Sequence, residues 1–218
     1  MRFRDRQEAG IRLAAALEVY RKESPVVIGL TRGGVPVAAE VARALGAPLD
    51  ALVVRKLGAP MQPELALGAI TEAGGRWIDD GLVAHTRTPP EALHAVEARE
   101  RVVLDERIAR YRAVRPREPI SARTVIVVDD GIATGATVRA ALWALRRERP
   151  AKLVLAVPVA ASSSLRGLSH LADEVVCLAP IDDLFAVGVW YEDFSATSDA
   201  TVLSLLRSGA PKATDATV

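Results

Sequence analysis

Short apolar runs alternate with amphipathic stretches along most of this chain, which is the pattern of alternating strands and helices. Apolar runs rich in β-branched residues predict buried strands at 26–30, 49–57, 125–128, 152–159 and 174–178. Stretches with helical periodicity predict helices at 5–20, 35–45, 138–149 and 162–171. Strand runs without polar alternation fit a sheet that is covered on both faces. The pattern therefore predicts an α/β fold around a mainly parallel sheet.

One long segment, 58–114, does not follow this alternation. Its first part predicts a hairpin with strands at 65–71 and 76–78. A capping box at 88–91, with prolines in the first turn, predicts the start of a long charge-rich helix that ends near Ala113. We interpret the segment as an insertion into the strand–helix fold.

The composition sets the broad class of protein. A chain of 218 residues with 50% hydrophobic content can bury a full core, so we expect one domain over 1–218 with a disordered tail at 209–218. The formal charge of +1 gives no basic field for nucleic acid. No segment reaches the roughly 18 apolar residues that a membrane span needs. The single cysteine, Cys177, is expected to be an inert core residue, which suits a reducing cytoplasm.

The stretch Val125–Val138, VIVVDDGIATGATV, carries the clearest chemical signal. A buried strand ends in two carboxylates, Asp129 and Asp130, and a loop of small and hydroxylated residues leads directly into a helix. This order places backbone N–H groups and the positive end of a helix dipole around one small concavity, an arrangement that binds phosphate. A plain strand-to-helix turn with a solvated aspartate pair is the alternative interpretation.

The residues of this loop narrow the choice of phosphate ligand. The loop contains no lysine, which a Walker loop would need, and it lacks the three glycines of a dinucleotide fingerprint. An acidic pair before a phosphate cradle can accept hydrogen bonds from a vicinal diol. A sugar phosphate with free ribose hydroxyls satisfies both halves of the motif.

A second candidate for an anion site follows the first predicted strand. The sequence Thr31-Arg32-Gly33-Gly34 leaves backbone N–H groups free at a strand end, and Arg32 offers a guanidinium group. Taken alone, these residues are equally consistent with a glycine turn before a helix and a solvated cation.

The stretch VIVVDDGIATGAT resembles the phosphoribosyl-pyrophosphate (PRPP) motif of type I phosphoribosyltransferases. The patterns FRDR-x-E-A-G, RKLGAP-x-x-PELALGAI and FAVG-x-WY-x-DF extend the resemblance over nearly the whole chain, toward a bacterial group of predicted phosphoribosyltransferases. The resemblance implies a three-layer fold with a mainly parallel sheet of the type I class. It also implies that 58–87 contains the hood and mobile loop that close over the sugar.

The resemblance also assigns roles to individual residues. It implies that the 5′-phosphate of PRPP binds to Ala133, Thr134, Gly135, Ala136 and Thr137. It implies that pyrophosphate binds to Thr31, Arg32, Gly33, Gly34 and Lys56. Mg²⁺ would be held by Asp129 and Asp130 through water or the ribose, and the acceptor would contact Phe185 and Val187. The catalytic set would be Asp129, Asp130, Arg32, Lys56 and Glu64.

The general base is the least defined part of this interpretation. In the hypoxanthine-guanine branch of the family an acidic residue in the PRPP loop serves as base, but here that position is Ala133. The loop looks more like the adenine branch, in which the base comes from the closing loop. Glu64, Glu72 and His85 are the candidates, and an ordinary surface role is the alternative for each.

Three functions are compatible with these motifs. The first is transfer of the phosphoribosyl group of PRPP to a small, nucleobase-like acceptor, with pyrophosphate released. The second is PRPP sensing without catalysis, against which stands the lack of a helix-turn-helix pattern and of a basic face. The third is hydrolysis of a sugar phosphate. We expect PRPP and a small acceptor as partners, neither nucleic acid nor membrane, and a homodimer formed through apolar strips on 58–113.

Overall fold

The computed structural model describes residues 1–72 and 74–209, and its centre is a five-stranded sheet in which all neighbouring strands are parallel. The strand order is β2-β1-β6-β7-β8. The strands are β1 (Val26–Leu30), β2 (Leu49–Leu52), β6 (Thr124–Val128), β7 (Lys152–Ala161) and β8 (Glu174–Ile181). The predicted α/β class with a mainly parallel sheet is confirmed.

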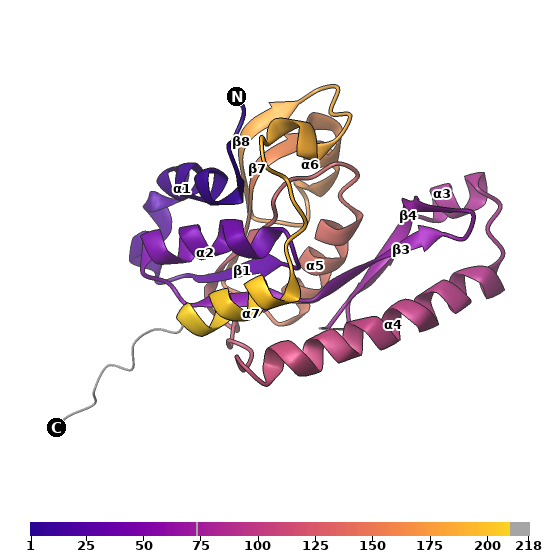
Figure 1. Cartoon of the computed structure of the whole chain (residues 1–218), viewed down its shortest axis with the longest axis horizontal. Coiled ribbons are helices and arrows are strands. Elements are labelled where there is room, and N and C mark those ends of the chain that lie inside the picture. Colours follow the sequence, from indigo (N-terminus) through magenta and orange to yellow (C-terminus); the bar gives the residue numbers. More distant parts are fainter. Residues whose placement is uncertain (73, 210–218) are drawn as a thin grey trace.

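Helices cover both faces of this sheet, which explains why its strands are apolar on both sides. The helices and 3₁₀ turns of the core are α1 (Arg6–Ala16), η1 (Glu18–Glu23), α2 (Gly34–Leu45), α5 (Ala136–Arg147), α6 (Ser162–Leu168), η2 (Val187–Trp190) and α7 (Asp199–Ser208). One buried cluster joins α1, α2 and α7 to one face, and a second joins α5 and α6 to the other. The fold therefore has three layers (Figure 1).

The segment predicted as an insertion forms an arm that extends away from this core (Figure 1). Its antiparallel sheet, in the order β3-β4-β5, consists of β3 (Val54–Ala59), β4 (Gln62–Thr71) and β5 (Arg76–Ile78). A short helix, α3 (Asp80–His85), and a long helix, α4 (Pro90–Arg112), complete it. The predicted hairpin and long helix are confirmed as elements.

The strand predicted over 49–57 is in fact two strands that belong to different sheets. The chain leaves the core sheet at Val53, whose backbone N–H donates to Glu72 Oε2 at 3.1 Å. The Val53 carbonyl accepts from the Glu72 backbone N–H, also at 3.1 Å. These bonds end β2 and begin the arm at β3, because they satisfy Val53 outside the core ladder.

Other boundaries also differ from the sequence predictions. The predicted capping box at 88–91 is wrong: Pro89 is the N-cap of α4 without a side-chain bond, and the Thr88 hydroxyl pairs with the Thr86 hydroxyl at 2.7 Å. The first helix ends at Ala16 and continues as η1. Helix α7 was not predicted. Of the tail predicted to be disordered, 210–218 lies outside the described residues.

The arm is joined to the core by a buried ionic cluster around Arg112. Its guanidinium donates to Asp50 Oδ1 at 2.7 Å and to both Glu72 oxygens at 2.7 and 3.0 Å. It also donates to the Ala51 carbonyl at 2.6 Å. Because Asp50 is in β2, Glu72 follows β4 and Arg112 ends α4, this cluster fixes the arm to the edge of the core sheet.

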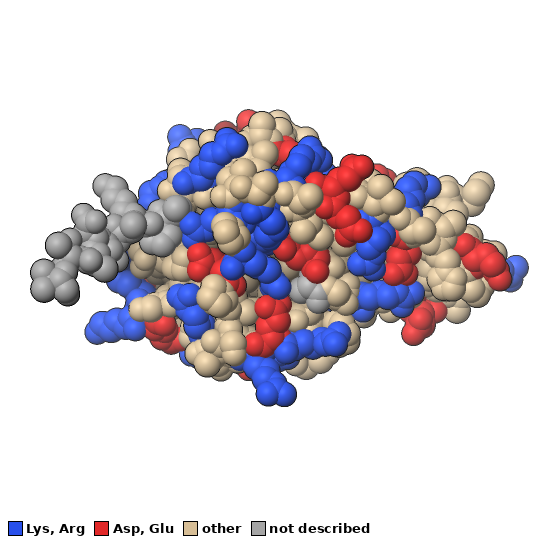
Figure 2. All heavy atoms as spheres, turned by 90° about the horizontal axis from the view of Figure 1, so that it is seen from below, with Lys and Arg blue, Asp and Glu red and all other residues tan. Residues whose placement is uncertain are grey.

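The surface mixes both charges. Lys and Arg side chains are intermixed with Asp and Glu side chains over the face shown in Figure 2. No helix among residues 1–72 and 74–209 is long and apolar enough to cross a membrane.

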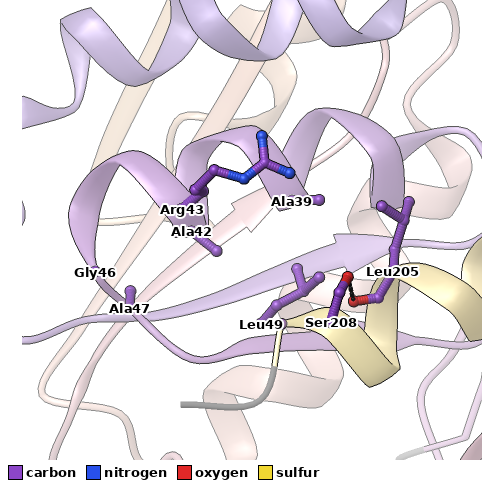
Figure 3. Close-up of a pocket in the computed structure, with 9 residues that line it drawn as sticks. Ala39, Ala42, Arg43, Gly46, Ala47, Leu49, Leu205 and Ser208 are labelled. Atoms are coloured by element: carbon purple, nitrogen blue, oxygen red, sulfur yellow. Dashed lines mark hydrogen bonds between the residues drawn. The ribbon is translucent and has the colours of Figure 1, made fainter. Parts of the chain in front are cut away.

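A small hollow lies between α2, the start of β2 and α7. Its volume is ≈ 250 Å³, and its walls include Arg43, Leu49, Leu205 and Ser208 (Figure 3). The Ser208 hydroxyl donates to the Leu205 carbonyl at 3.0 Å within α7. Because it lies at the end of α2 and the beginning of β2, the hollow is at the amino ends of the strands. It is therefore separate from the edge at which parallel strands place their loops.

Candidate functional site

The two loops predicted to bind anions meet at the carboxyl edge of the core sheet. Strands β1 and β6 are parallel neighbours, with Gly29 paired to Val128, so their following loops leave the sheet side by side. A Cβ atom on Gly34 would lie 2.5 Å from the Val128 carbonyl oxygen. A Cβ atom on Gly33 would lie 1.9 Å from Asp130 Oδ2. The two loops therefore adjoin at the edge of the sheet where open parallel sheets bind their ligands.

The acidic pair at the end of β6 is held in place from several sides. The Asp130 backbone N–H donates to Asp129 Oδ1 at 2.9 Å. The Tyr191 hydroxyl donates to the Asp130 carbonyl at 2.6 Å. Arg6 Nε donates to Asp130 Oδ2 at 2.8 Å. Backbone and carboxylate at this position are thus both oriented by other parts of the chain.

The pKa values of both carboxyl groups of the pair are raised above their ordinary range. Burial raises the pKa of both carboxyl groups, and the neighbouring Asp130 raises the pKa of Asp129 further, whereas Arg6 lowers both pKa values. Among residues 1–72 and 74–209, no three His, Cys, Asp or Glu side chains are grouped to hold a metal ion. A magnesium ion here would take one or two carboxylate oxygens from the pair and its other ligands from substrate and water, which is the usual coordination of Mg²⁺ with phosphates.

The loop after the acidic pair leads into an uncapped helix N-terminus. Helix α5 begins at Ala136, and its N-cap Gly135 has φ 80° and makes no side-chain capping bond. The first N–H groups of a helix have no intrahelical partner and carry the positive end of its dipole. Backbone bonds from Ile132 to Val159 and from Ala161 to Ile132, at 3.0 and 2.9 Å, fix the loop to β7. These bonds hold the uncapped start of α5 in a fixed position at the carboxyl edge of the sheet.

A single cavity joins this loop to the arm and to the segment after β8. Its volume is ≈ 670 Å³. Its walls are Lys56, Glu64, Ala66, Gly131, Ile132, Ala133, Thr134, Gly135, Ala136, Thr137, Val138, Phe185, Ala186 and Val187. All five residues predicted to bind the 5′-phosphate, both predicted acceptor contacts, Lys56 and Glu64 thus face one space.

Lys56 and Glu64 interact across the mouth of this cavity. Lys56 Nζ lies 3.1 Å from Glu64 Oε2 and 3.2 Å from the Glu64 carbonyl. The side chain of Glu64 is 95% exposed and that of Lys56 is 38% exposed. Exposed ion pairs contribute at most about 1 kcal/mol. Exchange of the Glu64 carboxylate for a phosphate on Lys56 would therefore cost little.

The other predicted pyrophosphate residues lie beside the acidic pair and are not on the cavity wall. The Thr31 hydroxyl accepts from the Val54 backbone N–H at 3.3 Å, which ties this loop to the start of the arm. The peptide bond between Thr31 and Arg32 is cis. The positive charge of Arg32 acts to lower the pKa values of Tyr111 and Asp199, which places Arg32 on the side of α4 and α7.

The predicted acceptor residues form one wall. Phe185 is 94% exposed, so its ring is available to a ligand. Val187 packs on Gly131, where an added Cβ atom would lie 2.4 Å from Val187 Cγ1. Tyr191 and Phe194 are structural, since the Tyr191 ring packs between the tilted rings of Phe3 and Phe194 with ring centroids 5.5 and 4.9 Å apart.

Two of the three candidate bases lie away from this cavity. Glu72 is bound by Arg112 in the cluster that anchors the arm. His85 lines a different hollow, at the tip of the arm beside Met61 and Leu65. Glu64 is the remaining candidate on the cavity wall.

Sequence reasoning missed Arg6. It lies in the FRDR pattern that carried part of the resemblance. Its contact with Asp130 could not be predicted, because the two residues are far apart in the sequence. The available signal was its place at the start of an amphipathic helix.

Comparison with known proteins relates the whole chain to one group. A family model described as "Phosphoribosyl transferase domain" matches residues 6–193. Predicted phosphoribosyl transferases from two Mycobacterium tuberculosis strains are 48% identical over 204 residues, which cover 94% of this chain and 46% of theirs. The chain spans about half the length of these curated relatives. The crystal structure of TT1426 from Thermus thermophilus is 46% identical with a TM-score of 0.79, covering 96% of this chain and 100% of that one.

Proposed function

The chain belongs to the phosphoribosyl transferase family, and from this premise we propose that it transfers the 5-phosphoribosyl group of PRPP to a small, nitrogenous, nucleobase-like acceptor. Pyrophosphate would be the second product. One observation carries the proposal: the uncapped start of α5, Lys56 and the predicted acceptor contacts line one cavity, directly beside the acidic pair. The cavity lies within the usual volume range of small-molecule sites.

The 5′-phosphate would bind at residues 133–137, where N–H groups without helical partners and the hydroxyls of Thr134 and Thr137 can donate hydrogen bonds. The ribose hydroxyls would then lie at Asp129 and Asp130. Lys56 and the N–H groups of Gly33 and Gly34 would receive the leaving pyrophosphate. Residues 133–137 and Lys56 line the cavity, and the acidic pair and the Gly33-Gly34 loop adjoin it at Gly131.

The reaction breaks the bond between the ribose C1 and pyrophosphate and forms one from C1 to the acceptor nitrogen. Because negative charge grows on the leaving group, fixed donors near it lower the barrier, and each such donor is typically worth about 3 kcal/mol. Mg²⁺ bound to PRPP would neutralise part of that charge. The chain would also lower the barrier by positioning, because two reactants held in contact react in an effectively unimolecular step.

The acceptor would lie against Phe185 and Val187, and Glu64 would take its proton. Glu64 is the candidate base on the cavity wall, and its exposed pairing with Lys56 leaves it free to move. We expect Glu64→Gln to lower kcat by roughly tenfold or more, with an unchanged melting temperature. An unchanged kcat would remove Glu64 from this role.

The test is a pyrophosphate-release assay with PRPP, Mg²⁺ and a panel of nucleobases, together with a no-acceptor control. A transferase releases pyrophosphate only with an acceptor, whereas a hydrolase releases it without one. A PRPP-sensing protein would bind PRPP, measured by thermal stabilisation, and release none with any acceptor. Absence of both binding and release would overturn the proposal.

A double variant, Asp129→Asn with Asp130→Asn, tests the ribose contact. We expect it to lose the thermal stabilisation by PRPP. The matched control is Asp182→Asn with Asp183→Asn, an adjacent aspartate pair that is exposed just after β8. Equal stabilisation of the two variants would contradict the assignment.

A further inference from the structure

Arg6, in the first turn of α1, makes three different contacts at the rim of the site. Its Nε donates to Asp130 Oδ2 at 2.8 Å, and its Nη1 donates to the Ser195 carbonyl at 2.7 Å. Its guanidinium carbon lies 4.0 Å from the centroid of the Phe194 ring. A residue near the amino end thus connects the acidic pair to the segment that follows η2.

This ion pair differs from the others on the same helix. The side chains of Arg6 and Asp130 are 12% and 14% exposed. Arg12 and Arg4, which both pair with Glu8, are 40% and 72% exposed. Pairs with exposed side chains contribute little, whereas removing one partner of a buried pair leaves an uncompensated charge. The contact of Arg6 with Asp130 is therefore a buried ion pair and not an ordinary surface salt bridge.

The carboxylate of Asp130 is confined by Arg6 and by the pyrophosphate-side loop together. Oδ2, which accepts from Arg6, also fills the space where Gly33 would carry a Cβ atom. With Oδ2 engaged and the backbone carbonyl held by Tyr191, the rotation of the side chain is fixed. Within residues 1–72 and 74–209, Oδ1 accepts no hydrogen bond from another residue, so it is the oxygen left for a ligand hydroxyl.

We propose that Arg6 is a positioning residue for the sugar: it holds Asp130 so that Oδ1 meets the ribose hydroxyls of PRPP. This inference rests on the proposed function and adds a residue outside the PRPP motif to the site. Arg6 does not touch the reacting atoms. It acts through Asp130, and its bond to the Ser195 carbonyl ties the acidic pair to the segment that follows η2.

The geometry requires a guanidinium group. A planar fork can donate to the Asp130 carboxylate and the Ser195 carbonyl while its face lies on the Phe194 ring. Lysine has one compact ammonium on a flexible stem, so it cannot make both bonds and the stacking contact at once. Arg6→Lys would keep the charge and lose the alignment.

The test compares Arg6→Ala and Arg6→Lys with Arg12→Ala, which removes the same charge from the same helix and a similar contact with a ring, that of Phe3. We expect both Arg6 variants to raise the KM for PRPP roughly tenfold or more, with a smaller effect on the acceptor KM. Arg12→Ala should leave both constants near their original values. Added guanidine should partly restore PRPP binding to Arg6→Ala and leave Arg6→Lys unchanged.

A double-mutant cycle decides whether Arg6 acts through Asp130. In an Asp130→Asn background, Arg6→Ala should cause little further loss of PRPP binding, because the group it positions is already gone. Additive losses, or equal effects of Arg6→Ala and Arg12→Ala, would overturn the inference. Melting temperatures show whether each variant is folded. If Arg6→Ala does not fold, the comparison of Arg6→Lys with Arg12→Ala still tests the inference. If the unmodified protein fails to bind PRPP, the proposed function fails, not this inference alone.

Discussion

Gly33 and Asp130 are packed so closely that a Cβ atom on the glycine would lie 1.9 Å from Asp130 Oδ2. The glycine is therefore needed for a reason besides its backbone N–H group. The aspartate that we place at the ribose occupies the volume of the missing side chain. The two loops are thus one unit, and a change in either displaces the other.

We expect Gly33→Ala to abolish PRPP binding. The methyl group must push the Asp130 carboxylate away, which breaks its bond to Arg6, and overpacking of this kind costs about 1–3 kcal/mol in stability. The measurement is thermal stabilisation by PRPP, beside the melting temperature without ligand. Gly81→Ala is the control, because its Cβ would meet its nearest neighbour at an ordinary 3.4 Å. Normal PRPP binding by Gly33→Ala would show that the carboxylate can lie elsewhere.

Phe185 should matter for the acceptor and hardly at all for stability. Its side chain is 94% exposed, so Phe185→Ala loses almost no buried area and should leave the melting temperature unchanged. Stacking on an aromatic ring contributes about 1–3 kcal/mol per base. We therefore expect a rise of roughly tenfold in the acceptor KM, with the PRPP KM unaffected. Val189→Ala, at a 55% exposed position in the same segment, is the control.

Arg112 should be among the most sensitive positions for folding. Arg112→Ala leaves Asp50 and Glu72, whose side chains are 1% and 6% exposed, as buried charges without their partner. Loss of one partner from such a cluster costs about 3–5 kcal/mol. Denaturant unfolding should show this loss, while Arg110→Ala, at a 55% exposed position, should change stability little. A loss below about 1 kcal/mol would mean that the arm does not depend on this cluster.

The ionised Asp199 carboxylate, at the start of α7, should make the free energy of unfolding fall at low pH. Burial raises its pKa, but the hydrogen bond from Tyr111 and the charges of Arg107, Arg32 and Arg110 outweigh burial, so that the pKa lies below its usual range. A lowered folded-state pKa contributes stability above the unfolded value of about 3.9, and this stability is lost as pH falls through the folded value.

The corresponding experiment follows urea unfolding of the original protein and Asp199→Asn between pH 7 and pH 3. The variant should be less stable at pH 7, and the difference should shrink as the pH falls. A constant difference over the whole range would show that the charge of Asp199 is not what holds α7 to α4.

The sequence alone determined the parallel sheet and the two loops. Runs such as 125–128 are apolar without alternation, and only a strand covered on both faces needs that pattern. The carboxylates and small residues that follow it are local in sequence, so their strand–loop–helix order was readable without coordinates. The hairpin and long helix of the arm were readable for the same reason.

Tertiary structure alone decided which side chains meet. Arg6 reaches Asp130 across 124 positions of sequence, and Glu72, a candidate base by its neighbourhood, is instead bound by Arg112. Strand β2 ends at Leu52 because the Val53 N–H donates to Glu72, and α7 depends on contacts of Asp199 with α4. The local pattern of apolar and polar residues predicts which face of a helix or strand is buried. Which distant charge satisfies a buried carboxylate is decided only when the elements pack.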